Sequence, residues 1–203
     1  METTLPTRLS AIILAGGKSS RMGKDKALIE MQGVPLLQRT ANLVQGYANP
    51  VYIITPWIER YQRIVSANCY LLRETCPSGE TQGPLVGFAQ ALVHVKTEWV
   101  LLLACDLPNL KTVAMEEWLL QLDHVYDKKV ACLPRHEKGW EPLCGFYRSS
   151  CLTSLDRFIE GGGRSFQQWL QFNCVQELFV SDRSVLFNCN TPLDLTHLRC
   201  REK

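Results

Sequence analysis

The residues most suggestive of chemistry form a glycine-rich basic loop at positions 16–26. The loop opens on the adjacent glycines Gly16 and Gly17 and holds a single acid, Asp25. Its cations are Lys18, Arg21, Lys24 and Lys26. Adjacent glycines let backbone N–H groups approach a ligand closely and form a concave site for an anion. This pattern predicts that the loop binds a polyphosphate.

The excess positive charge of the chain lies in this loop. The 203 residues include 22 basic and 20 acidic side chains, a net charge of +2. Outside positions 16–26, 18 basic residues face 19 acidic ones. Because no broad basic surface remains, the composition argues against nucleic acid or an anionic membrane as a partner.

Two familiar phosphate-binding motifs are excluded by spacing. A P-loop requires four residues between its glycines and a Ser or Thr after its lysine. Here five residues separate Gly17 from Gly23, and Lys24 is followed by Asp25. The dinucleotide fingerprint also fails, because Gly16 and Gly17 are adjacent. The remaining alternative, a solvated basic turn, is disfavoured because the loop directly follows a buried strand.

Apolar runs alternate with helical spacings over the first 123 residues, as in a parallel sheet covered by helices on both faces. The predicted strands are 9–14, 51–54, 70–72, 99–104, 130–133, 143–147 and 175–180. The predicted helices are 34–47, 57–65, 84–95, 149–160, 165–172 and 192–198. We expect a single domain over 1–203, with 1–8 a flexible N-terminus.

Asp106 follows the strongest strand signal, the apolar run 99–104. Ligands of open α/β sheets bind beyond the carboxyl ends of the strands, so Asp106 is expected to face the same crevice as the glycine loop. A carboxylate there can hold Mg²⁺, which bridges phosphate oxygens. The alternative is a turn-capping aspartate beside Pro108; the nearby glycine loop favours the metal role.

Three further segments are candidate binding elements. Gly83 and Pro84 open a helix whose N-terminus suits an anion or a base edge, or simply starts the helix. Glu74 could accept hydrogen bonds from a guanine edge, or be a solvated loop acid. Asn188 and Asn190 precede the last predicted helix and could bind a ligand, although capping is commoner for Asn.

The remaining composition indicates a cytoplasmic protein. The nine cysteines are scattered without a C-x-x-C pair, as expected for reduced thiols. The N-terminus has no signal-peptide region, and no apolar run approaches the length of a membrane span.

These residues together resemble the molybdenum cofactor guanylyltransferases of the nucleotidyltransferase superfamily. Positions 14–26 are similar to the signature loop of that family. In the same order follow Gly83-Pro84-Leu85, Asp106 with Pro108, Glu141-Pro142-Leu143, and the segment 188–192. The resemblance covers roughly residues 9–198.

The resemblance implies a three-layer Rossmann-like α/β fold with a mainly parallel sheet. It also implies transfer of GMP from GTP to the terminal phosphate of molybdopterin, with Mg²⁺ and release of pyrophosphate. Arg21 and Lys26 would stabilise the triphosphate, and Asp106 would bind Mg²⁺ and nucleotide. The implied nucleotide contacts are Leu14, Ala15, Gly16, Gly17, Lys26, Glu74, Gly83, Asp106, Asn188 and Asn190. At Thr55 the family often has Asn.

Three alternatives stay open. The first is a cytidylyltransferase that uses CTP on the same cofactor, and the second is a sugar-phosphate nucleotidyltransferase. Both families typically have Ala where Gly16 stands. The third is a non-catalytic carrier of the cofactor. Transient contact with molybdoenzymes or other cofactor-assembly proteins is also expected.

Overall fold

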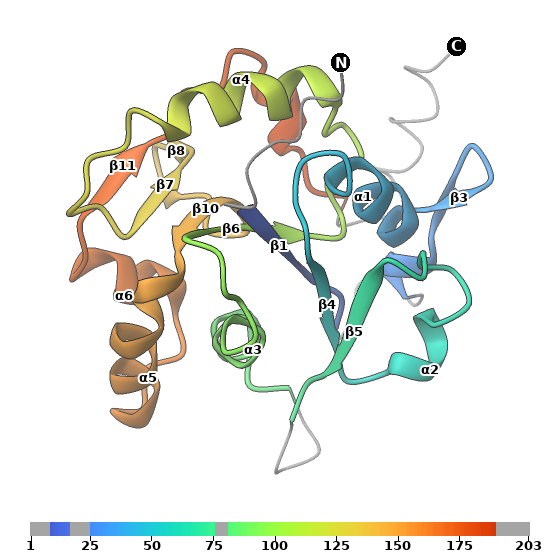
Figure 1. The fold of residues 1–203 in the computed structure, drawn as a ribbon, viewed down its shortest axis with the longest axis horizontal. Coiled ribbons are helices and arrows are strands. Elements are labelled where there is room, and N and C mark those ends of the chain that lie inside the picture. Colours follow the sequence, from blue (N-terminus) through green and yellow to red (C-terminus); the bar gives the residue numbers. More distant parts are fainter. Residues whose placement is uncertain (1–8, 17–24, 76–80, 190–203) are drawn as a thin grey trace.

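A computed structural model describes residues 9–16, 25–75 and 81–189 (Figure 1). Its centre is a seven-stranded sheet in the order β11-β7-β10-β6-β1-β4-β5. The strands are β1 (Leu9–Leu14), β4 (Val51–Thr55), β5 (Cys69–Arg73), β6 (Trp99–Ala104), β7 (Ala131–Leu133), β10 (Cys144–Arg148) and β11 (Val175–Glu177). In this described sheet only β10 runs antiparallel to its neighbours, which confirms the mainly parallel architecture.

Helices cover both faces of the sheet (Figure 1). They are α1 (Leu36–Val44), α2 (Ile58–Tyr61), α3 (Pro84–Leu92), α4 (Thr112–Leu122), α5 (Leu152–Glu160) and α6 (Phe166–Gln171). Side chains of α1 and α4 share one buried cluster, and those of α3, α5 and α6 share another. The sheet separates the two clusters, as the predicted three-layer fold requires.

The central strand β1 is apolar except for the buried Ser10, whose hydroxyl oxygen accepts a hydrogen bond from the Thr97 hydroxyl at 2.8 Å. Ala11 and Ile13 belong to the cluster under α1 and α4, whereas Ile12 belongs to the cluster under α3. A strand buried on both faces is apolar in a nearly continuous run rather than at alternate positions. The neighbouring strand β6 follows the same rule, which is why both strands are correctly bounded by sequence prediction.

Most differences from the predicted elements are local, but α4 (Thr112–Leu122) is a helix whose bounds were not predicted from the sequence. The predicted helix 34–47 begins only at Leu36, because β3 (Val34–Pro35) pairs with β2 (Glu30–Met31) in a small hairpin. A second hairpin joins β8 (Arg135–His136) and β9 (Gly139–Trp140). Short 3₁₀ helices form at η1 (Lys26–Leu28), η2 (Ser149–Cys151) and η3 (Arg183–Leu186). The predicted helix 192–198 lies outside the described residues.

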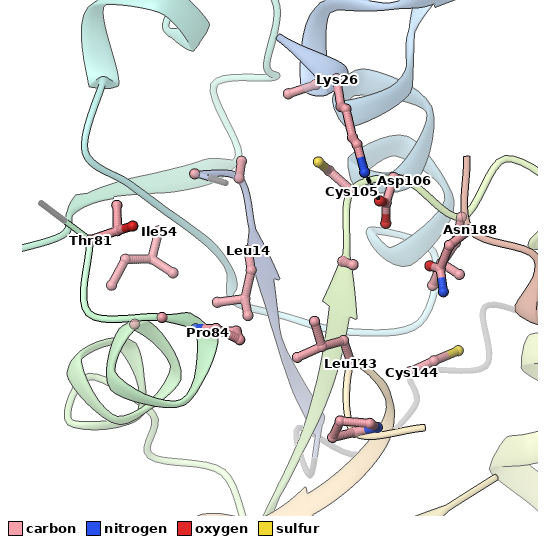
Figure 2. A pocket seen from close by; sticks show the side chains of 18 of the residues that line it. Leu14, Lys26, Ile54, Thr81, Pro84, Cys105, Asp106, Leu143, Cys144 and Asn188 are labelled. Carbon is pink, nitrogen blue, oxygen red and sulfur yellow. Dashed lines mark hydrogen bonds and ion pairs between the residues drawn. The ribbon is translucent and has the colours of Figure 1, made fainter. Parts of the chain in front are cut away.

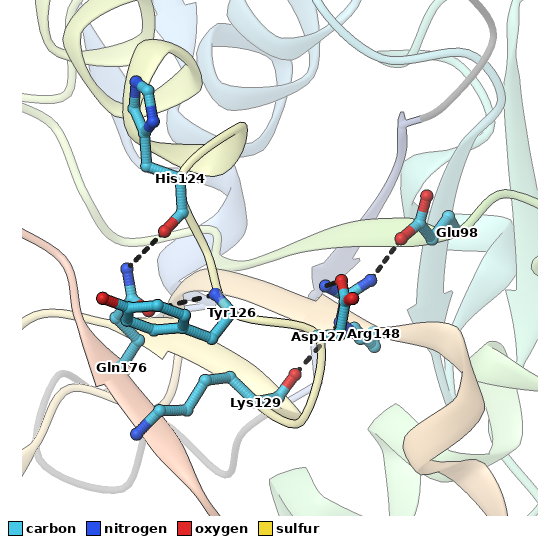
Figure 3. Close-up of polar contacts among 7 residues, drawn as sticks. All are labelled: Glu98, His124, Tyr126, Asp127, Lys129, Arg148 and Gln176. Atoms are coloured by element: carbon cyan, nitrogen blue, oxygen red, sulfur yellow. Dashed lines mark hydrogen bonds and ion pairs between the residues drawn. The ribbon is translucent and has the colours of Figure 1, made fainter.

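Arg148, the last residue of β10, links several segments at the edge of the sheet where the parallel strands begin (Figure 3). Its Nε donates to the Lys129 carbonyl at 3.1 Å, and its guanidinium also pairs with the Glu98 carboxylate. The guanidinium lies 4.3 Å from the centre of the Trp99 ring, where β6 begins. These contacts join the start of β6 to the end of β10 and leave the opposite, carboxyl edge to the binding loops.

Candidate functional site

A cleft of about 480 Å³ opens at the carboxyl ends of β1, β4 and β6 (Figure 2). Eight residues singled out from the sequence line it: Leu14, Ala15, Gly16, Lys26, Glu74, Gly83, Asp106 and Asn188. Gly17, Arg21 and Asn190 lie outside the described residues. The register of the sheet explains this convergence, because Leu14 at the end of β1 is paired with Ala104 at the end of β6. The loops that follow both strands therefore start side by side.

An ion pair crosses the cleft between Lys26 and Asp106. Lys26 Nζ lies 3.1 Å from Asp106 Oδ2, and the two side chains are 20% and 14% exposed. The backbone carbonyl of Asp106 accepts a hydrogen bond from Cys189 N–H at 3.0 Å. Each charge of the pair compensates the other in a partly dehydrated cleft, where an isolated charge would be costly.

Asp25 fixes the segment that carries Lys26. Its Oδ1 accepts a hydrogen bond from Ala27 N–H at 3.1 Å, which caps η1. Its Oδ2 accepts one from the hydroxyl of Tyr61 at 2.6 Å, and Arg60 Nη1 lies 3.5 Å away. No local pattern in the sequence links Asp25 to a tyrosine 36 positions away, so sequence reasoning missed this role.

Tyr61 is suited to hold Asp25 because its ring is fully buried. Burial, together with the neighbouring Asp25 carboxylate, raises the pKa of Tyr61. The hydroxyl therefore stays protonated at neutral pH and donates its hydrogen bond without titrating. Tyr61 is the last residue of α2 and lies on the side of the sheet that α1 covers, so it ties the exit of the glycine loop to the core.

Gly16 and Glu74 lie close together in the lining of the cleft. A Cβ atom on Gly16 would lie 2.7 Å from Pro56 Cδ and 3.4 Å from Glu74 Oε2. The rigid Pro56 ring cannot move away easily, so this position needs glycine. The backbone N–H of Glu74 donates to the Thr55 carbonyl at 2.9 Å, which keeps Glu74 beside the strand ends.

Gly83 lines the cleft, whereas Thr55, at the end of β4, does not. Gly83 has a positive φ of 94° and precedes Pro84 at the first turn of α3, so the N-terminus of α3 faces the cleft. Such a terminus favours negative charge. Thr55 is fully buried instead, and its hydroxyl oxygen accepts a hydrogen bond from Trp57 N–H at 3.1 Å. It is not among the cleft-lining residues.

The cysteines near the cleft are unsuited to nucleophilic chemistry. Burial, with the charge of Asp106 adding to it, raises the pKa of the Cys105 thiol, and burial likewise raises that of Cys144. Both thiols are protonated at neutral pH. None of the seven described cysteines forms a disulfide with another described cysteine: Cys69, Cys105, Cys132, Cys144, Cys151, Cys174 and Cys189.

The described ranges contain neither a clustered metal site nor a helix that could span a membrane. No group of three or more His, Cys, Asp and Glu side chains in residues 9–16, 25–75 and 81–189 could hold a metal ion. In the same ranges, no helix has the length and apolar character that crossing a membrane requires.

Comparison with known proteins agrees with this geometry. Residues 11–175 match the family described as "MobA-like NTP transferase domain". A protein from Nostoc sp. named "Probable molybdenum cofactor guanylyltransferase" is 58% identical over 187 residues, covering 92% of this chain and 88% of that protein. A protein of the same name from Synechococcus elongatus is 44% identical, covering 91% and 95%.

A solved structure supports the fold. The "Molybdopterin-guanine dinucleotide biosynthesis protein A" of Archaeoglobus fulgidus superposes with a TM-score of 0.76 at 21% sequence identity. The superposition covers 96% of this chain and all of that one.

Replacing Tyr61 by Phe tests whether Asp25 positions Lys26. The change removes one hydroxyl and leaves Asp25 without its shortest hydrogen bond. We expect the dissociation constant for GTP, measured by calorimetry, to rise about fivefold to tenfold, and the free energy of unfolding to fall by about 1–2 kcal/mol. Tyr126→Phe at an exposed tyrosine serves as the control. GTP binding as tight in Tyr61→Phe as in wild type would refute the positioning role.

Proposed function

The chain belongs to the MobA-like NTP transferase family and, within it, to the molybdenum cofactor guanylyltransferases, and we propose that it transfers GMP from GTP to the terminal phosphate of molybdopterin. The products are molybdopterin guanine dinucleotide and pyrophosphate. The resemblance seen in the sequence is thereby confirmed, and the chain is a nucleotidyltransferase. The observation that carries the proposal is the ion pair between Lys26, at the end of the glycine-rich loop, and Asp106, just after β6.

The cleft offers a partner for each part of GTP. Lys26, with Arg21 outside the described residues, would bind the triphosphate. Guanine presents N–H donors at N1 and N2, and the carboxylate of Glu74 can accept from both. The other proposed nucleotide contacts are Leu14, Ala15, Gly16, Gly17, Gly83, Asp106, Asn188 and Asn190. The positive end of α3 adds a favourable field for the phosphates.

The residues present fit a bound Mg²⁺. This ion commonly takes only one or two protein carboxylates and completes its shell with water and substrate phosphates. Asp106 supplies such a carboxylate at the end of β6, so a cluster of protein ligands is not needed. When bound there, Mg²⁺ would neutralise phosphate charge.

The chain's own task is to bring one anion onto another. The acceptor is a phosphate monoester, whose second pKa near 6 leaves it mostly ionised at pH 7. It needs no general base, in keeping with the protonated thiols at the cleft. Lys26 would leave Asp106 and bind the phosphates of GTP. The residues lining the cleft would hold the acceptor phosphate in line with the GTP phosphate that it attacks.

We further propose that the reaction takes place in the cytoplasm, where thiols stay reduced. The described cysteines, which form no disulfide with one another, support this proposal. Partners beyond the two substrates would be transient, such as the molybdoenzymes that receive the product.

The nucleotide preference separates this proposal from its rivals. We expect pyrophosphate release in the presence of molybdopterin to be fastest with GTP, when GTP, CTP, ATP and UTP are compared in parallel. Each reaction without molybdopterin is the control. A preference for CTP would identify a cytidylyltransferase, and binding of molybdopterin without turnover of any nucleotide would identify a carrier.

Substitutions at the two members of the ion pair are expected to impair different steps, turnover for Asp106 and GTP binding for Lys26. Asp106→Ala removes the metal-binding carboxylate, so Mg²⁺-dependent turnover should fall by roughly a hundredfold or more while metal-free GTP binding is kept. Lys26→Ala should raise the dissociation constant for GTP by about tenfold or more and leave that for molybdopterin nearly unchanged.

The control is Lys96→Ala, an exposed lysine that precedes the amino end of β6. Circular dichroism checks that each variant is folded. Near-normal turnover in Asp106→Ala, or equal losses of GTP and molybdopterin binding in Lys26→Ala, would contradict the assigned roles.

A further inference from the structure

A second cavity, of about 640 Å³, adjoins the cleft. It is lined by His136, Glu137, Lys138, Glu141, Arg183 and Leu186. Glu141 also lines the cleft that holds Asp106, so the two hollows share a wall. Leu186 of the cavity and Asn188 of the cleft also lie two positions apart on one short segment. The two hollows are therefore neighbours, with the Glu141 side chain between them.

The walls of this cavity are held in place from several sides. The hairpin β8–β9 is fixed to α6 by Gln167, whose amide donates to the Trp140 carbonyl at 2.6 Å and accepts from Trp140 N–H at 3.2 Å. On the other side, Arg183 of η3 donates to the Arg135 carbonyl at 2.5 Å. Glu141 N–H donates to the Pro134 carbonyl at 2.9 Å. The cavity is thus built before any ligand enters.

Glu141 is oriented by His136. The two side chains meet at 2.8 Å between His136 Nε2 and Glu141 Oε1. His136 Nδ1 accepts a hydrogen bond from Lys138 N–H at 3.1 Å. Because Nδ1 accepts, the ring proton lies on Nε2 and is donated to Glu141. The imidazole therefore holds Oε1 of Glu141, and Oε2 could accept a hydrogen bond from a ligand.

The charges of the lining define the ligand that it suits. Two acids, Glu137 and Glu141, and two cations, Lys138 and Arg183, surround the same space. A purely anionic or purely apolar ligand would leave one of these sets unmatched. A ligand with both an N–H donor edge and negatively charged groups would satisfy both. A pterin has such an edge in its amino-oxo-pyrimidine ring, and the dithiolene sulfurs of molybdopterin carry negative charge.

We propose that this second cavity binds the pterin half of the acceptor, with Glu141 accepting from the pyrimidine edge and Arg183 and Lys138 facing the anionic sulfurs. The inference rests on the proposed function, which requires an acceptor that reaches the nucleotide with its terminal phosphate. GTP would fill the cleft between Glu74 and Asp106, and the acceptor would enter across Glu141.

The test is a set of dissociation constants for molybdopterin and for GTP, measured separately by fluorescence and calorimetry. We expect Arg183→Ala and Glu141→Gln to raise the constant for molybdopterin by about tenfold each and to leave that for GTP within about twofold. The matched controls are Arg157→Ala and Glu160→Gln at exposed positions of α5. Lys138→Ala also removes a cation of the cavity but leaves η3 unchanged. It therefore tests the same role even if Arg183→Ala disturbs the fold of η3.

The outcomes separate this inference from the proposed function. Unchanged molybdopterin binding in all three cavity variants, or an equal rise of both constants, would overturn the inference while GMP transfer by the wild type could still stand. Absence of GMP transfer by the wild type, with molybdopterin binding weakened in the variants, would overturn the guanylyl transfer and keep the pterin site.

Discussion

The ion pair between Lys26 and Asp106 is the constraint around which the site is arranged. It joins residues 80 positions apart, at the carboxyl ends of neighbouring strands. In a cleft where both side chains are mostly buried, either charge alone would carry a desolvation cost that the other offsets. The pair thereby keeps two groups of opposite charge ready for substrates that also bring opposite charges, namely phosphates and their metal ion. Binding then replaces one set of partners by another and leaves no charge uncompensated.

The fold supplies the precision that this exchange needs. The register of β1 against β6 brings the two loop starts together, and helices on both faces keep the register fixed. Asp25 and Tyr61 then hold the lysine segment, whereas the hydrogen bond from Cys189 holds the backbone of Asp106. On the acceptor side, His136 does the same for Glu141. Asp25, Asp106 and Glu141 are thus each held by a hydrogen-bond donor from another part of the chain.

The parts that the sequence could predict are those determined by continuous local patterns. β1 and β6 are nearly continuous apolar runs because both faces are covered, and the run of β6 placed Asp106 at the correct edge of the sheet. The contact of Asp25 with Tyr61 depends on a distant pair with no periodic signal. The hairpin β8–β9 has two residues in each strand, too few to show alternation, and so the second cavity that it walls had no visible signature. The proximity of Glu74 to Gly16 likewise arises only from the folded loop.

The most direct test of the exchange is a crystal structure with GTP and Mg²⁺ bound. The distance to measure joins Lys26 Nζ and Asp106 Oδ2, which lie 3.1 Å apart in the structure described above. The account predicts that this distance opens beyond hydrogen-bonding range, with Lys26 on a phosphate oxygen and Asp106 directed to the metal ion. An ion pair still intact beside fully bound GTP and Mg²⁺ would contradict it.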